Sequence, residues 1–372
     1  MPDAAPRILI VTADIGAGHD LPAELLADGI RARRPDAAVE IVDGLAEMGP
    51  FILAATRNGA ETILQRLPRL FDLQYRLATA FPPTRWLTAV IGMVAGGRGL
   101  LGAVRRFRPD AIVSTYPGTT EVMARFKRIG RLRPPLASAV TDLAALRWWA
   151  HPDVDLHLIT HAESRAEVAA VAGPRADIRH VRGFSRPEFE DPPAPGAARA
   201  ALGLPASAPV VAVSGGGWGI GDVQGAARAV LGIPGATAVC LCGTNAVLRE
   251  RLEAAFRDEP RMRVEGFTDR MCEWLAAADV LVHSTAGLTV LEAQMCGTHV
   301  ISYGWGVAHL RANNAAYRRF RLADVATTPA ELRAALERAL AAPRPVDRSF
   351  ARLEHAADAV LSLAAAGRGA RA

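Results

Sequence analysis

Short apolar runs alternate with longer amphipathic segments along almost the whole chain. The runs are rich in Val, Ile and Leu, which is typical of strands buried on both faces of a parallel sheet. Because helix-like stretches separate them, the pattern predicts an α/β fold of two doubly wound, Rossmann-like domains. The predicted strands are Arg7–Thr12, Val39–Val42, Ala111–Ser114, Leu136–Thr141, Leu156–Thr160, Pro209–Ser214, Ala238–Leu241, Met262–Glu265, Asp279–His283 and Val300–Tyr303.

One proline-rich stretch interrupts this alternation, at Glu-Asp-Pro-Pro-Ala-Pro-Gly over residues 190–196. Its prolines cannot continue a helix or a central strand, so we expect an interdomain linker at 191–196. The predicted N-terminal domain is then 1–190 and the C-terminal domain 197–345. A final helix within 346–372 is expected to pack back on the N-terminal domain. Ligands of such sheets lie beyond the carboxyl ends of the strands, which predicts that the domains face a common cleft.

The composition is that of a globular protein, with 50% hydrophobic and 22% charged residues in 372. The four cysteines (Cys240, Cys242, Cys272 and Cys296) lack metal-ligand spacing and indicate buried thiols in a reduced compartment. The first residues lack the features of a signal peptide. The apolar stretch Leu87–Gly97 is too short to span a bilayer. We therefore expect a cytoplasmic protein that can also lie peripherally on the inner face of a membrane.

Residues 51–108 are unusually basic, with nine arginines against the acids Glu61 and Asp72. Large apolar residues are interleaved with the arginines, a pattern typical of segments that lie on an anionic membrane. The predicted membrane contacts are Arg66, Arg69, Arg76 and Trp86. A pair of ordinary helices with an apolar core face is the alternative. No recognised nucleic-acid motif accompanies the charge, so nucleic acid is not an expected partner.

The first predicted strand runs into a glycine-containing turn and a histidine, over Thr12–His19. Gly16 and Gly18 do not complete a dinucleotide-binding G-x-G-x-x-G pattern because position 21 is Leu21, and no Gly-Lys-Ser/Thr follows. Instead His19 opens the helix. An imidazole at the top of a sheet suits a base that takes a proton from a hydroxyl group. Helix capping or simple exposure is the alternative reading.

The second half contains three features that suit a nucleotide. Five glycines in Gly215–Gly221 let the backbone approach a diphosphate closely. At Phe267, after another strand, a backbone edge can meet a base. The run at 280–282 is followed by small residues that include Thr285 and Gly287, and a helix is predicted from Leu288. A helix start can hold phosphate, and Glu292 one turn later can hold hydroxyl groups.

A further set of polar and aromatic residues follows the strand that ends at Thr141. Asp142 suits a base, a partner for His19 or a helix cap. Trp148, Trp149 and His151 come shortly afterwards. The indoles suit stacking on a sugar or lining an acceptor site, and burial in the core is the alternative.

These motifs, in this order, resemble the monogalactosyldiacylglycerol synthases and the processive diacylglycerol glucosyltransferases. The resemblance covers about residues 7–345, and Gly266 to Glu292 is also similar to the donor site of the related peptidoglycan N-acetylglucosaminyltransferase (family 28-like). It implies the GT-B fold, a UDP-sugar donor and an inverting transfer that needs neither metal nor cofactor. The motifs that carry it are Gly-x-Gly-His at 16–19, Pro-Asp-Ala-Ile-Val-Ser-Thr-Tyr-Pro at 109–117, Val-Thr-Asp-Leu at 140–143, Trp-x-His-Pro at 149–152 and the glycine run at 215–221.

The resemblance implies roles for some residues of this chain and leaves the sugar-binding stretch open. It implies that Glu292 holds the ribose, that the Phe267 backbone meets uracil and that Gly216 and Gly217 hold the diphosphate. It implies that His19 is the acceptor base, with Gly18 beside it. The lipid transferases have Gly-Gln-Glu-x-Gly-Asn where this chain has Ala-His-Leu-Arg-Ala-Asn at 308–313. Asn313 fits and His309 can replace the amide, but an acid is lost at Leu310, so the sugar is left open.

The expected activity is transfer of a hexose from a UDP-sugar to a diacylglycerol-like lipid at a membrane surface. Three alternatives remain at this stage. They are transfer to a soluble small molecule, a UDP-sugar 2-epimerase, and a nucleotide-sugar-binding protein that has lost transfer.

Overall fold

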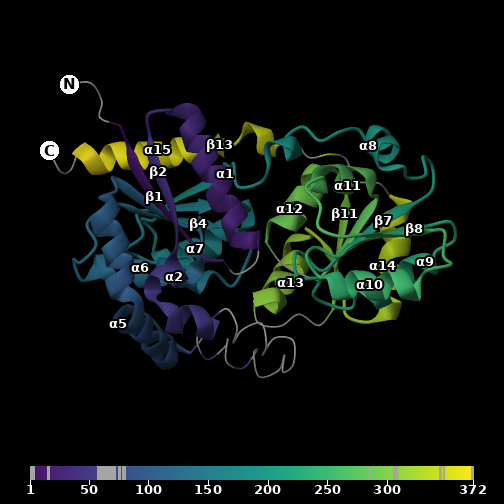
Figure 1. The fold of residues 1–372 in the computed structure, drawn as a ribbon, viewed down its shortest axis with the longest axis horizontal. Coiled ribbons are helices and arrows are strands. Elements are labelled where there is room, and N and C mark those ends of the chain that lie inside the picture. Colours follow the sequence, from purple (N-terminus) through teal and green to yellow (C-terminus); the bar gives the residue numbers. More distant parts are fainter. Residues whose placement is uncertain are drawn as a thin grey trace. The chain divides into compact units, whose positions relative to one another are not determined.

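The protein folds into two α/β units, which are described one at a time (Figure 1). The computed structural model describes residues 5–14, 17–56, 73, 77, 81–284, 287–304, 309–342, 346 and 348–369. Unit 1 comprises the described residues within Met1–Ser185 and Leu353–Ala372, and unit 2 those within Arg186–Arg352.

Unit 1 is built on a parallel sheet in the order β13-β6-β5-β4-β3-β1-β2. The strands β1, β3, β4 and β5 are buried along their length apart from the first residue of β1, as their apolar sequences predict. The strands of unit 1 are β1 (Arg7–Thr12), β2 (Ala38–Asp43), β3 (Ala111–Ser114), β4 (Leu136–Val140), β5 (Leu156–Ile159), β6 (Asp177–Arg182) and β13 (Glu354–His355).

Helices cover this sheet, and the chain returns to it at its C-terminal end. The helix α15 packs against α1 and β3, and Arg33 of α1 pairs with Asp358 of α15 at 2.7 Å. The helices are α1 (Ala17–Arg33), α2 (Gly44–Met48), α5 (Pro82–Phe107), α6 (Pro117–Arg128), α7 (Arg165–Ala172) and α15 (Ala356–Gly369), with 3₁₀ turns η1 (Leu146–Trp148) and η2 (Ala162–Ser164).

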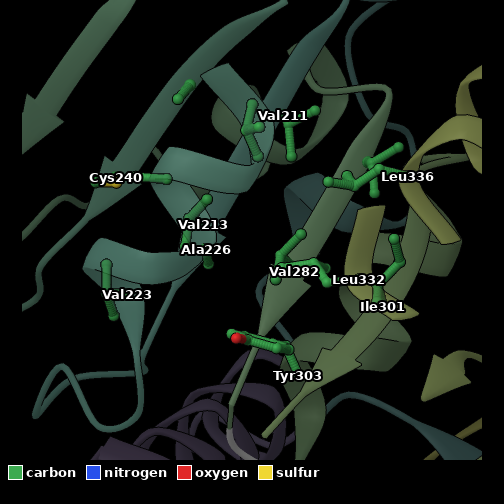
Figure 2. Packing of buried hydrophobic residues seen from close by; sticks show 14 of the residues in the cluster. Val211, Val213, Val223, Ala226, Cys240, Val282, Ile301, Tyr303, Leu332 and Leu336 are labelled. Atoms are coloured by element: carbon green, nitrogen blue, oxygen red, sulfur yellow. The ribbon is translucent and has the colours of Figure 1, made fainter. Parts of the chain in front are cut away.

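Unit 2 repeats the design with a parallel sheet in the order β12-β11-β10-β7-β8-β9. Side chains from β7, β10 and β11 meet those of α9 and α14 in a buried core that includes Val213, Val282 and Leu336 (Figure 2). The strands are β7 (Val210–Ser214), β8 (Thr237–Leu241), β9 (Met262–Glu265), β10 (Val280–His283), β11 (His299–Tyr303) and β12 (Asp324–Ala326). The helices are α8 (Pro195–Leu202), α9 (Val223–Leu231), α10 (Ala246–Ala255), α11 (Met271–Ala277), α12 (Leu288–Met295), α13 (His309–Phe320) and α14 (Pro329–Ala341), with 3₁₀ turns η3 (Pro187–Phe189) and η4 (Phe350–Arg352).

The proline-rich segment has a different role from the one expected at 191–196. The change of unit falls between Ser185 and Arg186, and again between Arg352 and Leu353. Pro195 and Gly196 form the first turn of α8. A proline suits that position because the first helical residue has no intrahelical partner for its N–H and needs the φ angle that the ring enforces.

The apolar stretch at 87–97 is also longer than the sequence indicated. It forms part of α5, in which Trp86–Phe107 has the length and composition of a membrane span; its most apolar 18-residue window has a mean hydropathy of 1.6 and is one-third buried. The helix continues past Arg98 to Phe107, and its glycines let it pack closely on α2. A Cβ atom on Gly99 would lie 1.6 Å from the Glu47 carbonyl oxygen, and one on Gly96 would lie 2.5 Å from Met48. One face of α5 is therefore packed against the rest of unit 1.

Replacing Gly99 with alanine is expected to destabilise the protein by about 1–3 kcal/mol, because the methyl group would push α5 away from α2. The matched control is Gly102→Ala in the same helix. There a Cβ atom would meet only the Arg106 guanidinium, at 3.5 Å. That change should be neutral or stabilising by up to about 1 kcal/mol, because alanine is the better helix former. Urea unfolding of both variants measures the difference, and equal stability would contradict the close packing.

Candidate active site

In unit 1 the predicted residues His19 and Asp142, and Thr115, which was not predicted, follow three neighbouring strands. His19 follows β1, Thr115 follows β3 and Asp142 follows β4, and these strands pair in the order β4-β3-β1. Because the strands are parallel, their carboxyl ends lie at one edge of the sheet. The first turn of α1 is tied to the end of β1 by the Thr12 hydroxyl, which donates to Asp20 Oδ1 at 2.8 Å. Gly18, beside His19, is exposed.

His19 is held in a defined orientation. Its Nδ1 lies 3.0 Å from the Thr115 carbonyl oxygen. A carbonyl oxygen can only accept, so Nδ1 carries a proton, and in the neutral imidazole Nε2 is the basic nitrogen. The imidazole also contacts the ring of Tyr116 edge-on, with centroids 5.1 Å apart, and lies 5.9 Å from that of Trp149. Burial raises the pKa of Tyr116 to about 12, so this neighbour stays neutral. The geometry suits a base that accepts a proton at Nε2.

The carboxylate of Asp142 is hydrogen-bonded to the indole of Trp149. Its Oδ2 accepts a hydrogen bond from Trp149 Nε1 at 3.0 Å. The 3₁₀ turn that follows begins after Ala145, so Asp142 does not cap it. Trp149 is only 1% exposed and packs in a core cluster with Val140. Stacking of this ring on a substrate sugar is therefore not what the structure provides. The buried indole instead contacts both His19 and Asp142.

The other two acceptor-side predictions differ in their surroundings. His151 is buried, and its Nδ1 accepts from the Asp153 backbone N–H at 3.1 Å. Burial lowers the pKa of His151 and keeps it neutral. This environment argues against direct contact between His151 and an acceptor. Trp148 is half-buried, and its Nε1 is among the buried polar atoms without a hydrogen-bond partner in the described part of the chain.

In unit 2 the predicted donor residues also follow neighbouring strands. The glycine loop follows β7, the turn before α12 follows β10, and β8 lies on the other side of β7. The loop passes close to both neighbours. A Cβ atom on Gly221 would lie 2.4 Å from Ser284 Oγ, and one on Gly243 would lie 2.4 Å from the Gly217 carbonyl oxygen. Glycines are required here by contact distance, as expected for a loop that approaches other backbone and a ligand.

The loop turns on left-handed residues, with φ angles of 69° at Gly216 and 63° at Gly219. Three of its N–H groups are used internally: Gly216 donates to Ser214 Oγ, Gly219 to Gly216 O and Ile220 to Gly215 O. The N–H groups of Gly217 and Trp218 have no partner among the residues that the structure describes. Gly217 is also exposed. Within this loop, Gly217 is therefore better placed than Gly216 to donate to a diphosphate.

The helix α12 begins at Leu288, as predicted, after Gly287, whose φ of 93° only glycine adopts readily. Glu292 lies in the second turn of α12 and is 7% exposed. A helix start and a shielded carboxylate thus follow the same strand. Thr285 lies outside the described residues.

The remaining donor-side predictions lie farther along the sequence. Phe267 follows β9 in an exposed loop, where its side chain is 70% exposed. Asn313 is buried in α13. His309 is the first residue of that helix, and its side chain lies outside the described part of the structure.

A set of polar residues that the sequence pattern did not reveal also shapes the loop. Ser214 and Ser284 lie at the ends of β7 and β10, and Thr244 and Asn245 lie in the turn after β8. The signal that could have found them is their shared position, because each follows the end of a predicted parallel strand. Small hydroxyl and amide side chains at that edge are candidates to hold backbone or ligand.

One hollow of about 450 Å³ lies elsewhere on unit 2, lined in part by His299, Arg318 and Arg321. It lies at the amino ends of β11 and β12, away from the edge where parallel sheets bind ligands, and contains none of the predicted site residues. No group of three or more His, Cys, Asp or Glu side chains that could hold a metal is found in the described parts of the chain.

Known families match both halves of the sequence. The monogalactosyldiacylglycerol (MGDG) synthase family matches residues 19–179, and the glycosyl transferases group 1 family matches 223–342. A relative from rice (Oryza sativa subsp. indica), "Probable monogalactosyldiacylglycerol synthase 2, chloroplastic", is 26% identical over 80% of this chain and 66% of its own. The chain thus spans just under two thirds of that relative. The "Processive diacylglycerol beta-glucosyltransferase" of Bacillus subtilis is 24% identical over 80% of this chain and 77% of its own.

The fold has solved counterparts. The glycosyltransferase SnogD from Streptomyces nogalater aligns with a TM-score of 0.58 and 16% identity, over 98% of this chain and 100% of that one. The two parallel sheets with helices, and the glycine loop after β7, are consistent with the fold of these proteins. The chain has the GT-B fold of glycosyltransferases, and its sequence is similar to those of the monogalactosyldiacylglycerol synthases and processive diacylglycerol glucosyltransferases.

Proposed function

We propose that the protein transfers a hexose from a UDP-sugar to a diacylglycerol-like lipid at a membrane surface, with inversion and without a metal ion. Unit 2 holds the donor and unit 1 the acceptor. Inversion in a single displacement requires a base that removes the acceptor proton as its oxygen attacks the anomeric carbon.

The observation that carries the proposal is the orientation of His19. The Thr115 carbonyl oxygen accepts a hydrogen bond from His19 Nδ1 at 3.0 Å, so in the neutral imidazole Nε2 is the basic nitrogen. The aromatic neighbours Tyr116 and Trp149 keep the imidazole in place. A fixed tautomer lowers the entropy cost of bringing the base to the acceptor hydroxyl.

The donor side supports departure of a diphosphate. The Gly217 and Trp218 N–H groups and the start of α12 offer backbone donors, and the helix dipole favours negative charge at Leu288. Such donors stabilise a leaving group without a metal because they are already oriented. Glu292 is proposed to hold the ribose hydroxyls, and the backbone at Phe267 to meet the base.

The lipid acceptor is supported by the names of the relatives and by the outer face of α5. Leu87, Ile91 and Val94 lie on successive turns of one face and are 49–76% exposed, and Trp86 beside them is 58% exposed. Farther along the helix, the exposed outer side carries Arg98 and Arg105. Apolar side chains followed by arginines suit insertion into a bilayer with the guanidinium groups at the phosphates. Because the glycines on the opposite face of α5 pack against unit 1, we propose that α5 attaches the protein to the membrane surface without spanning the bilayer. Arg66, Arg69 and Arg76 lie outside the described residues, and the expectation for them stays a prediction.

Replacing Val94 with aspartate is expected to weaken binding to anionic vesicles, because a charge would have to enter the hydrocarbon edge. Val247→Asp is the matched control, since Val247 of α10 is 75% exposed and Val94 is 76% exposed. Vesicle sedimentation measures both. Raised salt should weaken the arginine contribution and spare part of the apolar one. Equal binding by the two variants would remove α5 from the membrane surface.

The activity itself is tested by UDP release. A screen of UDP-sugars for thermal stabilisation identifies the donor, which is then offered with diacylglycerol or with soluble aglycones. The proposal expects UDP release that depends on the lipid. Release with soluble acceptors alone would make a small molecule the acceptor. Sugar conversion without an acceptor would indicate an epimerase, and donor binding without either reaction a binding protein.

A further inference from the structure

We propose that Asn245, together with Thr244, positions the glycine loop for the donor diphosphate. The inference rests on the proposed function, because it takes the loop after β7 as the diphosphate site. It assigns Asn245 a role that acts through the loop rather than by contact with the reacting atoms.

Residues of the turn after β8 donate hydrogen bonds to two consecutive carbonyl groups of the loop. Asn245 Nδ2 donates to the Trp218 carbonyl oxygen at 3.0 Å. Both the hydroxyl and the backbone N–H of Thr244 donate to the Gly217 carbonyl oxygen, each at 2.9 Å. Three hydrogen bonds from two residues therefore join β8 to the tip of a loop 27 residues earlier in the chain.

The Asn245 side chain performs two separate tasks with its two polar atoms. Its Oδ1 accepts the Leu248 N–H at 2.9 Å and so caps α10, while its Nδ2 holds the loop. The orientation of the amide follows from its partners, because an N–H must meet an oxygen acceptor and a carbonyl must meet a donor. Capping alone does not need the Nδ2 atom, since serine caps a helix as well.

These hydrogen bonds determine the direction in which the backbone N–H groups of the loop point. In a trans peptide the C=O of one residue and the N–H of the next point in opposite directions. Because the Gly217 carbonyl is fixed toward Thr244, the Trp218 N–H points away from that turn. This N–H has no partner among the described residues. The hydrogen bonds from the turn after β8 thus orient a backbone N–H donor toward the place of an anion. Without them, a loop with five glycines in seven residues would lose more conformational entropy when a ligand binds.

The test separates diphosphate positioning from folding. Asn245→Ser keeps the cap and removes the Nδ2 donor, and Thr244→Val keeps the shape of the side chain and removes the hydroxyl. Calorimetry with UDP and with uridine, which lacks phosphate, should show UDP binding about three- to tenfold weaker in each variant and uridine binding unchanged. Thr328→Ala is the control, because Thr328 caps α14 by accepting the Glu331 N–H and lies outside the loop. It should lower thermal stability and leave UDP affinity unchanged.

The outcomes are distinct. UDP affinity unchanged in both loop variants, or an equal loss of UDP and uridine binding, would overturn the positioning role while the proposed function stands. Absence of UDP binding by the unmodified protein would overturn the proposed function and the inference with it. If Asn245→Ser does not fold, Thr244→Val still decides, because it leaves the cap of α10 intact.

Discussion

Replacing His19 with alanine is expected to lower kcat by about 10²–10⁴-fold and to leave UDP affinity nearly unchanged. The reason is that the base acts only on the acceptor hydroxyl, and its loss removes a proton transfer made in the transition state. The Thr115 carbonyl oxygen holds Nδ1 at 3.0 Å, so Nε2 is the only ring nitrogen that can accept this proton. Steady-state kinetics with saturating acceptor, combined with calorimetry for UDP, measures the two quantities.

Asp142→Asn is the competing variant. The Asp142 carboxylate accepts the Trp149 indole N–H, and an amide oxygen can accept the same bond, so the packing around Trp149 should survive. If Asp142 only positions the indole, the variant should retain most of the activity. High activity in His19→Ala together with loss of activity in Asp142→Asn would reverse the two roles.

Replacing Glu292 with alanine should weaken UDP binding by about 1.5–3 kcal/mol, or roughly ten- to hundredfold. A carboxylate that accepts hydrogen bonds from ribose hydroxyls contributes more than a neutral group, and this one is shielded from water at 7% exposure. Calorimetry measures the affinity, and thermal unfolding checks that α12 keeps its structure.

Glu337→Ala supplies the control for this change. Glu337 lies on α14, is exposed and pairs with Arg333 at 3.0 Å. An exposed pair of this kind contributes little, so both UDP affinity and stability should change only slightly. Equal affinities in Glu292→Ala and the unmodified protein would remove Glu292 from the donor site.

The hydrophobic pattern predicted the central strands of both sheets and the edge strand β9. The bounds of β1, β3 and β9 are those predicted, and β7 and β10 differ by one residue at their starts. β1, β3, β7 and β10 are buried and have a neighbour on each side, so their apolar composition is explicit in the sequence, whereas β9 lies at the edge of its sheet. The pattern missed β6, β12 and β13, of which β12 and β13 are edge strands. β6 reads Asp-Ile-Arg-His-Val-Arg, and such strands are held by backbone hydrogen bonds to a neighbour rather than by an apolar signal of their own.

The chemistry of the site could be predicted only as residue types at strand ends. His19, Asp142 and the glycine loop lie at the expected edges of the sheets because a parallel α/β fold brings the ends of its strands together. Burial could not be predicted at Trp149 and His151. Each follows a strand in a short turn, and whether such a turn faces solvent or core depends on packing from β5 and α7, which lie later in the chain.

The sequence by itself determined the fold class, the number of α/β units, the family resemblance and the candidate residues, because periodicity and local spacing are properties of short segments. Only the tertiary structure shows the His19 tautomer, the position of the Trp149 indole between His19 and Asp142, and the hydrogen bond from Asn245 to the glycine loop. The contacts that join His19 to Thr115 and Asn245 to Trp218 span 96 and 27 residues, and that of His19 with Trp149 spans still more. A hydrogen bond or ring contact at that separation depends on how the strands pair in three dimensions, so no local pattern predicts it.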